Sequence, residues 1–283
     1  MNMRIEPSLL ANPELLFATL PSGISMPYVE RGVGEPMVFV HGSLCDYRYW
    51  DAQLASLSAH YHCIAPSLSH YWPAVEAGIQ NDFSWRNHVD EMAEFIAALD
   101  LGPVHLVGHS RGGSVAFNVA REHPGLVKTL TLADPGGPLR QAGVREASLP
   151  PAAHALRAKA ADLIDDGDVD AGLELFVDSV SVPGAWKKSG PRFRTMAVDN
   201  ASTLPKQLLD PLPAYSSETA GDLACRTLLI DGQRSPRMFR NNVETLAGWI
   251  RDADRQTVAG ASHGMNVAHP GVFNRLVHSF IES

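Results

Sequence analysis

The sequence predicts an α/β fold in which a mostly parallel central sheet has helices on both faces. Short apolar runs alternate with helical patterns along most of the chain, which is typical of parallel strands joined by crossover helices. Residues 138–221 break this alternation with helical patterns and frequent prolines. We therefore predict a core domain formed by residues 1–137 and 222–283. A helical cap of residues 138–221 is expected over the carboxyl ends of the strands, where such sheets bind ligands.

The expected strands are short apolar segments bounded by turn residues. They lie at residues 37–40, 61–65, 104–107, 129–133, 227–230 and 256–258. Apolar residues at helical spacing predict core helices at about 85–99, 114–122, 241–250 and 271–281. Two further helices are expected in the cap, at 154–164 and 171–180.

Composition excludes several classes of protein. The chain has 283 residues, of which 45% are hydrophobic, so it can bury a large core. Its net charge of −8 and the lack of a Lys/Arg cluster argue against nucleic acid and membrane surfaces as partners. We see no apolar run long enough to span a membrane and no secretory signal at the N-terminus. The scattered cysteines Cys45, Cys63 and Cys225 fit reduced thiols, so we expect a cytoplasmic protein.

A serine motif follows the predicted strand at 104–107. Residues 108–113 read Gly-His-Ser-Arg-Gly-Gly and directly precede a helical pattern. A Gly-x-Ser-x-Gly sequence between strand and helix is typical of a nucleophile elbow, in which a strained turn exposes the serine beside the positive end of a helix. Glycines suit this turn because the backbone passes too close for Cβ atoms. Ser110 is therefore the candidate nucleophile.

On these residues and three further landmarks, the chain resembles the α/β-hydrolase fold superfamily over nearly its whole length. The landmarks are a His-Gly-Ser loop at 41–43, the helical insertion, and a late histidine in Gly-Ala-Ser-His-Gly at 260–264. The resemblance implies that His263 is the catalytic base, because it follows the last predicted strand. It also implies an oxyanion hole formed by the backbone N–H groups of Ser43 and Arg111.

The position of the acid departs from the commonest pattern of that superfamily. Its members usually carry an aspartate in a motif like G-x-x-D-x-x-x-P after the cap, and here Ser235 occupies that position. Some members, including certain haloalkane dehalogenases and lipases, instead place the acid after the strand that follows the elbow helix, which is Asp134 here. We favour Asp134 as the acid, although an aspartate there can simply stabilise the turn into Pro135. Asp231 is the second candidate, and a Ser-His dyad without an acid is the third.

The resemblance implies a serine hydrolase that cleaves a small-to-medium carboxylic ester, lactone or thioester through an acyl-enzyme. It needs no cofactor, and no paired Cys/His spacing or H-E-x-x-H motif predicts a metal. Two alternatives stay open: hydrolysis of a carbon–carbon bond in a β-diketone-like compound, and a non-catalytic ligand-binding member of the fold, as the serine at position 235 could indicate. The expected partner is a small-molecule substrate, and a homo-oligomer is compatible with the sequence.

Several aromatic and histidine side chains have two interpretations each. His41 and His109 are expected to pack and form hydrogen bonds rather than react. The segment 69–73, Ser-His-Tyr-Trp-Pro, either lines a substrate pocket or packs as a surface loop. The same choice, between pocket roof and core packing, applies to four residues of the predicted cap: Phe176, Trp186, Phe193 and Met196.

Overall fold

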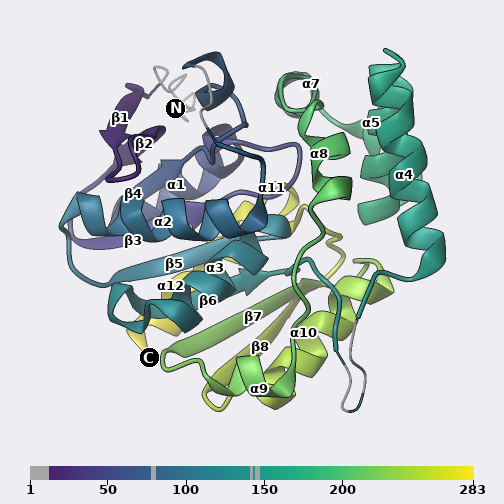
Figure 1. The fold of residues 1–283 in the computed structure, drawn as a ribbon. Helices are drawn as coiled ribbons and strands as arrows, with labels where there is room; N and C mark the ends of the chain where they lie inside the picture. The colour runs from purple at the N-terminus through teal and green to yellow at the C-terminus, as the bar shows by residue number, and fades with distance from the viewer. Residues whose placement is uncertain (1–12, 78–80, 141–142, 144–146) are drawn as a thin grey trace, which may run out of the picture.

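An eight-stranded sheet runs through the part of the chain that the structure, a computed structural model, describes: residues 13–77, 81–140, 143 and 147–283 (Figure 1). The strand order is β1-β2-β4-β3-β5-β6-β7-β8, with β3 to β8 parallel and β1 and β2 antiparallel to their neighbours. This confirms the predicted fold class. The strands are β1 (Leu16–Thr19), β2 (Ser25–Arg31), β3 (Glu35–Val40), β4 (Tyr61–Pro66), β5 (Val104–His109), β6 (Val127–Ala133), β7 (Arg226–Gly232) and β8 (Ala253–Val258).

Two hydrophobic layers cover the two faces of the sheet. Successive residues of a strand point to opposite faces, so Val38 of β3 contributes to one layer and Phe39 to the other. The first layer is completed by α2 (Trp85–Leu99), α3 (Arg111–Glu122) and α10 (Arg237–Trp249). The second is completed by α1 (Asp51–Leu57) and α12 (Pro270–Glu282). The continuous apolar runs of the central strands follow from this burial on both faces.

The antiparallel strands β1 and β2 are absent from the sequence-based prediction, which starts at residue 37. Every second residue of β1 is exposed, and β2 ends in two exposed charged residues, Glu30 and Arg31. Neither strand therefore forms the continuous apolar run by which buried parallel strands are recognised. They extend the sheet at the edge away from β6 and β7.

The segment between β6 and β7 is mainly helical. It contains α4 (Pro151–Asp165), α5 (Val169–Val180), α6 (Ala185–Lys188), α7 (Pro191–Asp199), α8 (Thr203–Leu209) and α9 (Ser217–Gly221). Helices α4, α5, α7 and α8 lie together at one side of the molecule, whereas α9 packs against α10 (Figure 1). A separate apolar cluster joins the first group and includes Leu173 and Trp186. Below, "the insertion" means helices α4 to α8.

Part of the sequence-based prediction falls outside the described residues. This holds for residues 1–12, where we expect no secretory signal, and for residues 141–142 and 144–146 of the predicted cap. The remaining short elements are η1 (Tyr47–Trp50), η2 (Ala74–Ala77), η3 (Pro124–Leu126) and α11 (Met265–Ala268). Within the described ranges, none of the helices has the length and apolar character needed to cross a membrane.

Candidate active site

Ser110 stands at the turn between β5 and α3 with an unusual backbone conformation. Its φ of 54° and ψ of −122° place it in a region that side chains other than glycine rarely adopt. Backbone hydrogen bonds fix the turn: the Ser110 N–H donates to the Ala133 carbonyl at 3.0 Å, and the Ser110 carbonyl accepts from Gly113 and Gly136 at 3.0 and 2.8 Å. Strain of this kind persists only where the surroundings over-determine it, as at functional sites.

The glycines of the motif are required by close backbone packing. A Cβ atom at Gly108 would lie 2.5 Å from the Gly112 carbonyl oxygen. A Cβ atom at Gly112 would overlap the carbonyl oxygens of Val40 and His41 at the end of β3. The elbow therefore lies directly against the His-Gly-Ser loop, as the predicted oxyanion hole of Ser43 and Arg111 requires.

His263 and Asp134 meet in the loops at the carboxyl ends of β8 and β6. The Nδ1 atom of His263 lies 3.0 Å from Oδ2 of Asp134, and Asp134 has no solvent-exposed surface. Ser235 donates a hydrogen bond of 2.5 Å to the same carboxylate oxygen. Ser235, at the position where related sequences place the acid, thus supports the aspartate of the neighbouring strand.

Asp231, the second candidate for the acid, lies elsewhere. Its carboxylate accepts hydrogen bonds from Thr257 at 2.5 Å and from Arg255 at 3.1 Å, both on the neighbouring strand β8. These contacts occupy both carboxylate oxygens. The structure therefore brings Asp134, and not Asp231, to the imidazole of His263.

Ser110 and His263 reach the same cavity from two different loops. No hydrogen bond joins the two side chains directly; in enzymes without substrate, such contacts are often long and tighten on binding. The ring of His263 is stacked on Phe239, with 4.0 Å between centroids, and lies 4.5 Å from the ring of His109. His109 donates from Nε2 to the His263 carbonyl oxygen at 2.8 Å, so it positions the loop of His263, as expected for a packed histidine.

Burial sets the charge states of this cluster. It lowers the pKa of His263 to about 3, with a further lowering by the positive charge of Arg157. His263 is therefore neutral at neutral pH, which is the form that accepts a proton. Burial also raises the pKa of Asp134, and the hydrogen bond from Ser235 opposes this rise.

The two predicted oxyanion donors border Ser110. Ser43 and Arg111 line the cavity at Ser110, and Arg111 is the first residue of α3, where the helix presents unpaired N–H groups. Among the hydrogen bonds between described residues, none uses the backbone N–H of either one. The side chain of Arg111 instead pairs with Asp210, at 2.9 Å, in the segment after α8.

His41 and the segment 69–73 pack beneath this region. His41 accepts the Leu68 N–H at Nε2 (3.1 Å) and contacts the Gly42 carbonyl oxygen from Nδ1 (3.0 Å), so it fixes the loop before Ser43. Tyr71 is fully buried against the ring of His41. The segment 69–73 is therefore a packed loop and does not line the cavities described below.

Two lobes of one hollow meet at Ser110, between the strand ends and the insertion. We name them by their distinguishing residues. The Arg157 lobe has a volume of about 310 Å³ and includes Arg111, Arg157 and Gln207 in its lining. The His263 lobe has a volume of about 320 Å³, includes His263 and Phe193, and is mostly apolar. Both lobes share Ser43, Ser110, Phe176 and Val180.

The predicted cap contains four side chains that could form either a pocket roof or part of the core: Phe176, Trp186, Phe193 and Met196. Phe176 and Phe193 line the hollow. Trp186 and Met196 are buried in hydrophobic clusters and line neither lobe. In the described part of the chain, no group of three or more His, Cys, Asp or Glu side chains could hold a metal ion.

Comparison with protein families agrees with this geometry. A family model described as "Alpha/beta hydrolase family" matches residues 37–276. The chain belongs to the alpha/beta hydrolase family. The resemblance inferred from the serine motif and the late histidine is thereby confirmed.

Relatives of this alpha/beta hydrolase carry different activities in their names. The (E)-2-((N-methylformamido)methylene)succinate hydrolase of Acinetobacter baylyi is 24% identical, over 90% of this chain and 94% of the relative. A non-heme haloperoxidase of Rhodococcus erythropolis is 26% identical, over 94% and 99%. An esterase from Thermogutta terrifontis superposes with a TM-score of 0.74 at 20% identity, covering 95% of this chain and 98% of the esterase, and shows the shared fold.

The site of this alpha/beta hydrolase contains residues that sequence reasoning missed. Phe239, stacked on His263, lies on α10, and Arg157 and Gln207 reach the hollow from α4 and α8. The sequence carries no motif for them, because their role depends on how the insertion folds over the strand ends. Gln207 also accepts a hydrogen bond of 2.6 Å from the Ser43 hydroxyl, which links α8 to the His-Gly-Ser loop.

Proposed function

We propose that the protein is a serine hydrolase that cleaves a carboxylic ester, thioester or lactone through an acyl-enzyme, with Ser110, His263 and Asp134 as its catalytic triad. The observation that carries the proposal is the 3.0 Å contact of His263 with buried Asp134, while His263 opens into the cavity that also holds Ser110. Such a constellation is recognised by geometry and roles rather than by sequence position.

In the proposed mechanism, neutral His263 takes the proton of Ser110 as the serine attacks the substrate carbonyl. Asp134 holds the imidazole by its Nδ1 atom and stabilises the imidazolium that forms. The N–H groups of Ser43 and Arg111 bind the oxyanion, and each such donor typically contributes about 2.7–4 kcal/mol. His263 then protonates the leaving group, and water repeats the cycle on the acyl-enzyme.

The family and the named relatives support hydrolysis but leave the bond open. One relative is named as a hydrolase of a substituted succinate, and a structural neighbour is named as an esterase. We favour an oxygen or sulfur ester because the proposed chemistry needs only an activated serine and an oxyanion site. Cleavage of a carbon–carbon bond in a β-diketone-like compound would use the same groups but must also protonate a carbanion leaving group, and an assay with such a compound beside an ester separates the two.

Labelling with a fluorophosphonate probe tests the proposal directly. The wild type should react covalently at Ser110, and Ser110→Ala should lose both the label and ester hydrolysis. Ser217→Ala serves as a matched control, because Ser217 is exposed at the start of α9. A wild type that stays unlabelled and inactive would indicate the non-catalytic alternative, and labelling that survives Ser110→Ala would exclude Ser110 as the nucleophile.

A further inference from the structure

The Arg157 lobe has a positive lining in a negatively charged protein. The chain carries a net charge of −8. Among the described residues that line this lobe there are nevertheless two arginines, Arg111 and Arg157, and no aspartate or glutamate. A cleft lined by charges of one sign concentrates ligands of the opposite sign. This distribution favours an anionic ligand in the lobe.

The two arginines differ in how their charges are balanced. Arg111 is paired with Asp210 at 2.9 Å, and its guanidinium lies over the ring of Phe83. Arg157 makes no hydrogen bond or ion pair with any described residue, and its guanidinium lies 6.0 Å from the ring centroid of Phe176. Burial, together with the nearby charge of Arg111, lowers the pKa of Arg157. A half-buried cation of this kind is stabilised when a ligand supplies the missing anion.

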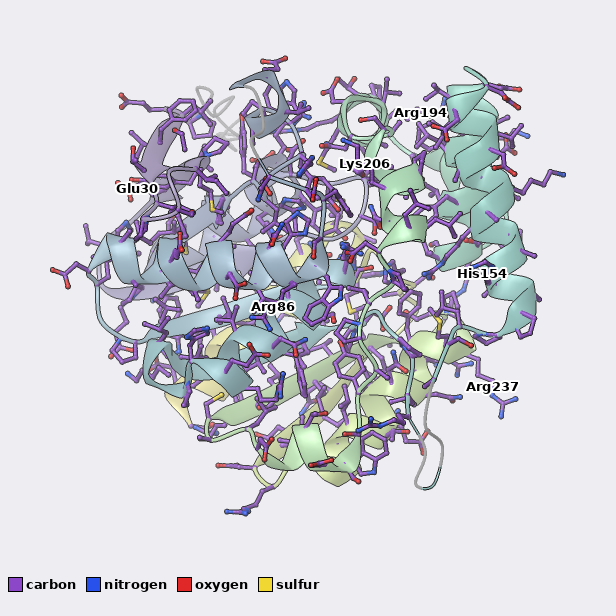
Figure 2. All side chains as sticks on the ribbon, in the orientation of Figure 1. Glu30, Arg86, His154, Arg194, Lys206 and Arg237 are labelled. Atoms are coloured by element: carbon purple, nitrogen blue, oxygen red, sulfur yellow. The ribbon has the colours of Figure 1, made fainter. Side chains whose placement is uncertain are left out.

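The position of Arg157 distinguishes it from other arginines that lack a polar partner among the described residues. Those arginines are exposed on the surface: Arg31, Arg234, Arg237, Arg251 and Arg275. Arg237, for example, projects away from the molecule (Figure 2). Arg157 instead lines the hollow that contains Ser110. Figure 2 also labels His154, which precedes Arg157 by three residues on α4.

The residues that line the two lobes indicate where the leaving group and the acyl group of a substrate lie. His263, which gives its proton to the leaving group, lines the His263 lobe and not the Arg157 lobe. The leaving group therefore lies in the His263 lobe, which is mostly apolar. The acyl group then extends from Ser110 into the Arg157 lobe, where it approaches the Arg157 guanidinium.

We propose that Arg157 binds a carboxylate on the acyl part of the substrate, so that the enzyme hydrolyses half-esters or half-thioesters of short dicarboxylic acids. This inference rests on the proposed function. The Oγ atom of Ser110 forms a bond to the esterified carbonyl carbon, the bond to the leaving alcohol or thiol breaks, and that group takes the proton from His263. Water then releases the dicarboxylate. Throughout, the second carboxylate stays paired with Arg157 and fixes the reacting carbonyl at Ser110.

A matched pair of esters tests this specificity. Mono-p-nitrophenyl glutarate and p-nitrophenyl butyrate share the leaving group and differ chiefly in the terminal carboxylate. The measured quantity is the ratio of their kcat/KM values, glutarate over butyrate. We expect Arg157→Gln to lower this ratio by about 10- to 100-fold, as for the loss of a hydrogen bond to a charged group. Arg157→Lys should retain part of the ratio, because it keeps the charge but not the bidentate geometry.

The control variant is Lys159→Gln, which removes a positive charge from an exposed position of the same helix. This variant should leave the ratio unchanged. A ratio that is the same in Arg157→Gln as in the wild type, or that falls equally in Lys159→Gln, would overturn the proposal.

A binding measurement separates failure of this inference from failure of the proposed function. If the wild type hydrolyses neither ester, the proposed function fails, and free glutarate becomes the probe. Glutarate should then raise the melting temperature of the wild type more than that of Arg157→Gln. Butyrate should shift the melting temperatures of the two proteins equally. Equal shifts by glutarate in both proteins would exclude a carboxylate site at Arg157.

Discussion

Replacing Asp134 with asparagine removes the carboxylate that contacts His263 and keeps the shape of the side chain. The amide can place its NH₂ group toward Nδ1 of His263, which then favours the wrong imidazole tautomer. It also cannot stabilise the imidazolium that forms when Ser110 is deprotonated. Both effects act on the chemical step, so we expect a large loss in kcat and a small change in KM.

The size of the loss follows from the geometry of the pair. Opposite charges 3.0 Å apart attract by about 5.5 kcal/mol at an effective dielectric constant of about 20. This energy corresponds to a factor of about 10⁴ in rate. Asp231→Asn is the matched variant: Asp231 contacts Thr257 and Arg255, so its loss should lower the melting temperature and change kcat far less.

Both variants are assayed with an ester that the wild type hydrolyses, and kcat and KM are measured separately. Circular dichroism and thermal unfolding establish that each variant is folded. If Asp231→Asn loses as much kcat as Asp134→Asn, or more, the assignment of the acid is wrong. A loss of only a few-fold in folded Asp134→Asn would show that the imidazolium needs no buried anion, as in a Ser-His dyad.

Three further predictions concern the same cluster and the elbow. In Asp134→Asn, adding Ser235→Asp should recover kcat by about tenfold or more, because the Ser235 hydroxyl lies 2.5 Å from the carboxylate oxygen that faces His263. No recovery would show that a carboxylate at position 235 cannot reach the imidazole. Burial raises the pKa of Asp134 to about 7, and the protonated acid cannot stabilise the imidazolium. We therefore expect kcat/KM to fall as the pH drops through about 7, although burial keeps His263 neutral there; a profile that stays flat down to about pH 5 would contradict this. Gly112→Ala should lower the melting temperature by about 5 °C, because the new Cβ atom overlaps backbone oxygens. Gly125→Ala, with open space around the new Cβ atom, should leave it unchanged. Equal melting temperatures of the two variants would show that the backbone of the elbow can move to accommodate the methyl group.

The sequence predicts the core of the fold well because buried parallel strands leave a continuous apolar signal. The expected helix at 85–99 coincides with α2, and each expected strand overlaps an observed one. The missed strands β1 and β2 pair antiparallel at the sheet edge, where half of the side chains face solvent. A helix such as α7 was missed for another reason: Pro191 reads as an interruption, but it is the first residue of that helix, where its missing N–H costs nothing.

Parts of the candidate site can be predicted from a local sequence pattern, whereas others depend on contacts between distant segments. Ser110 lies in a local pattern, and its turn conformation follows from neighbouring glycines. The meeting of Asp134 with His263 depends on the order of strands, which chain order and a family resemblance can anticipate. The lack of an ionic partner for Arg157 among the described residues could not be foreseen, because it depends on which carboxylates the folded insertion places nearby.

The hydrogen bond between the ring of His109 and the backbone of His263 spans 154 positions of sequence, and its donor is the immediate neighbour of Ser110. This bond couples the position of the His263 loop to that of the elbow. Helices α4 to α8 contribute no atom to this hydrogen bond. A rearrangement of those helices would therefore leave intact the hydrogen bond that ties the His263 loop to the residue next to Ser110.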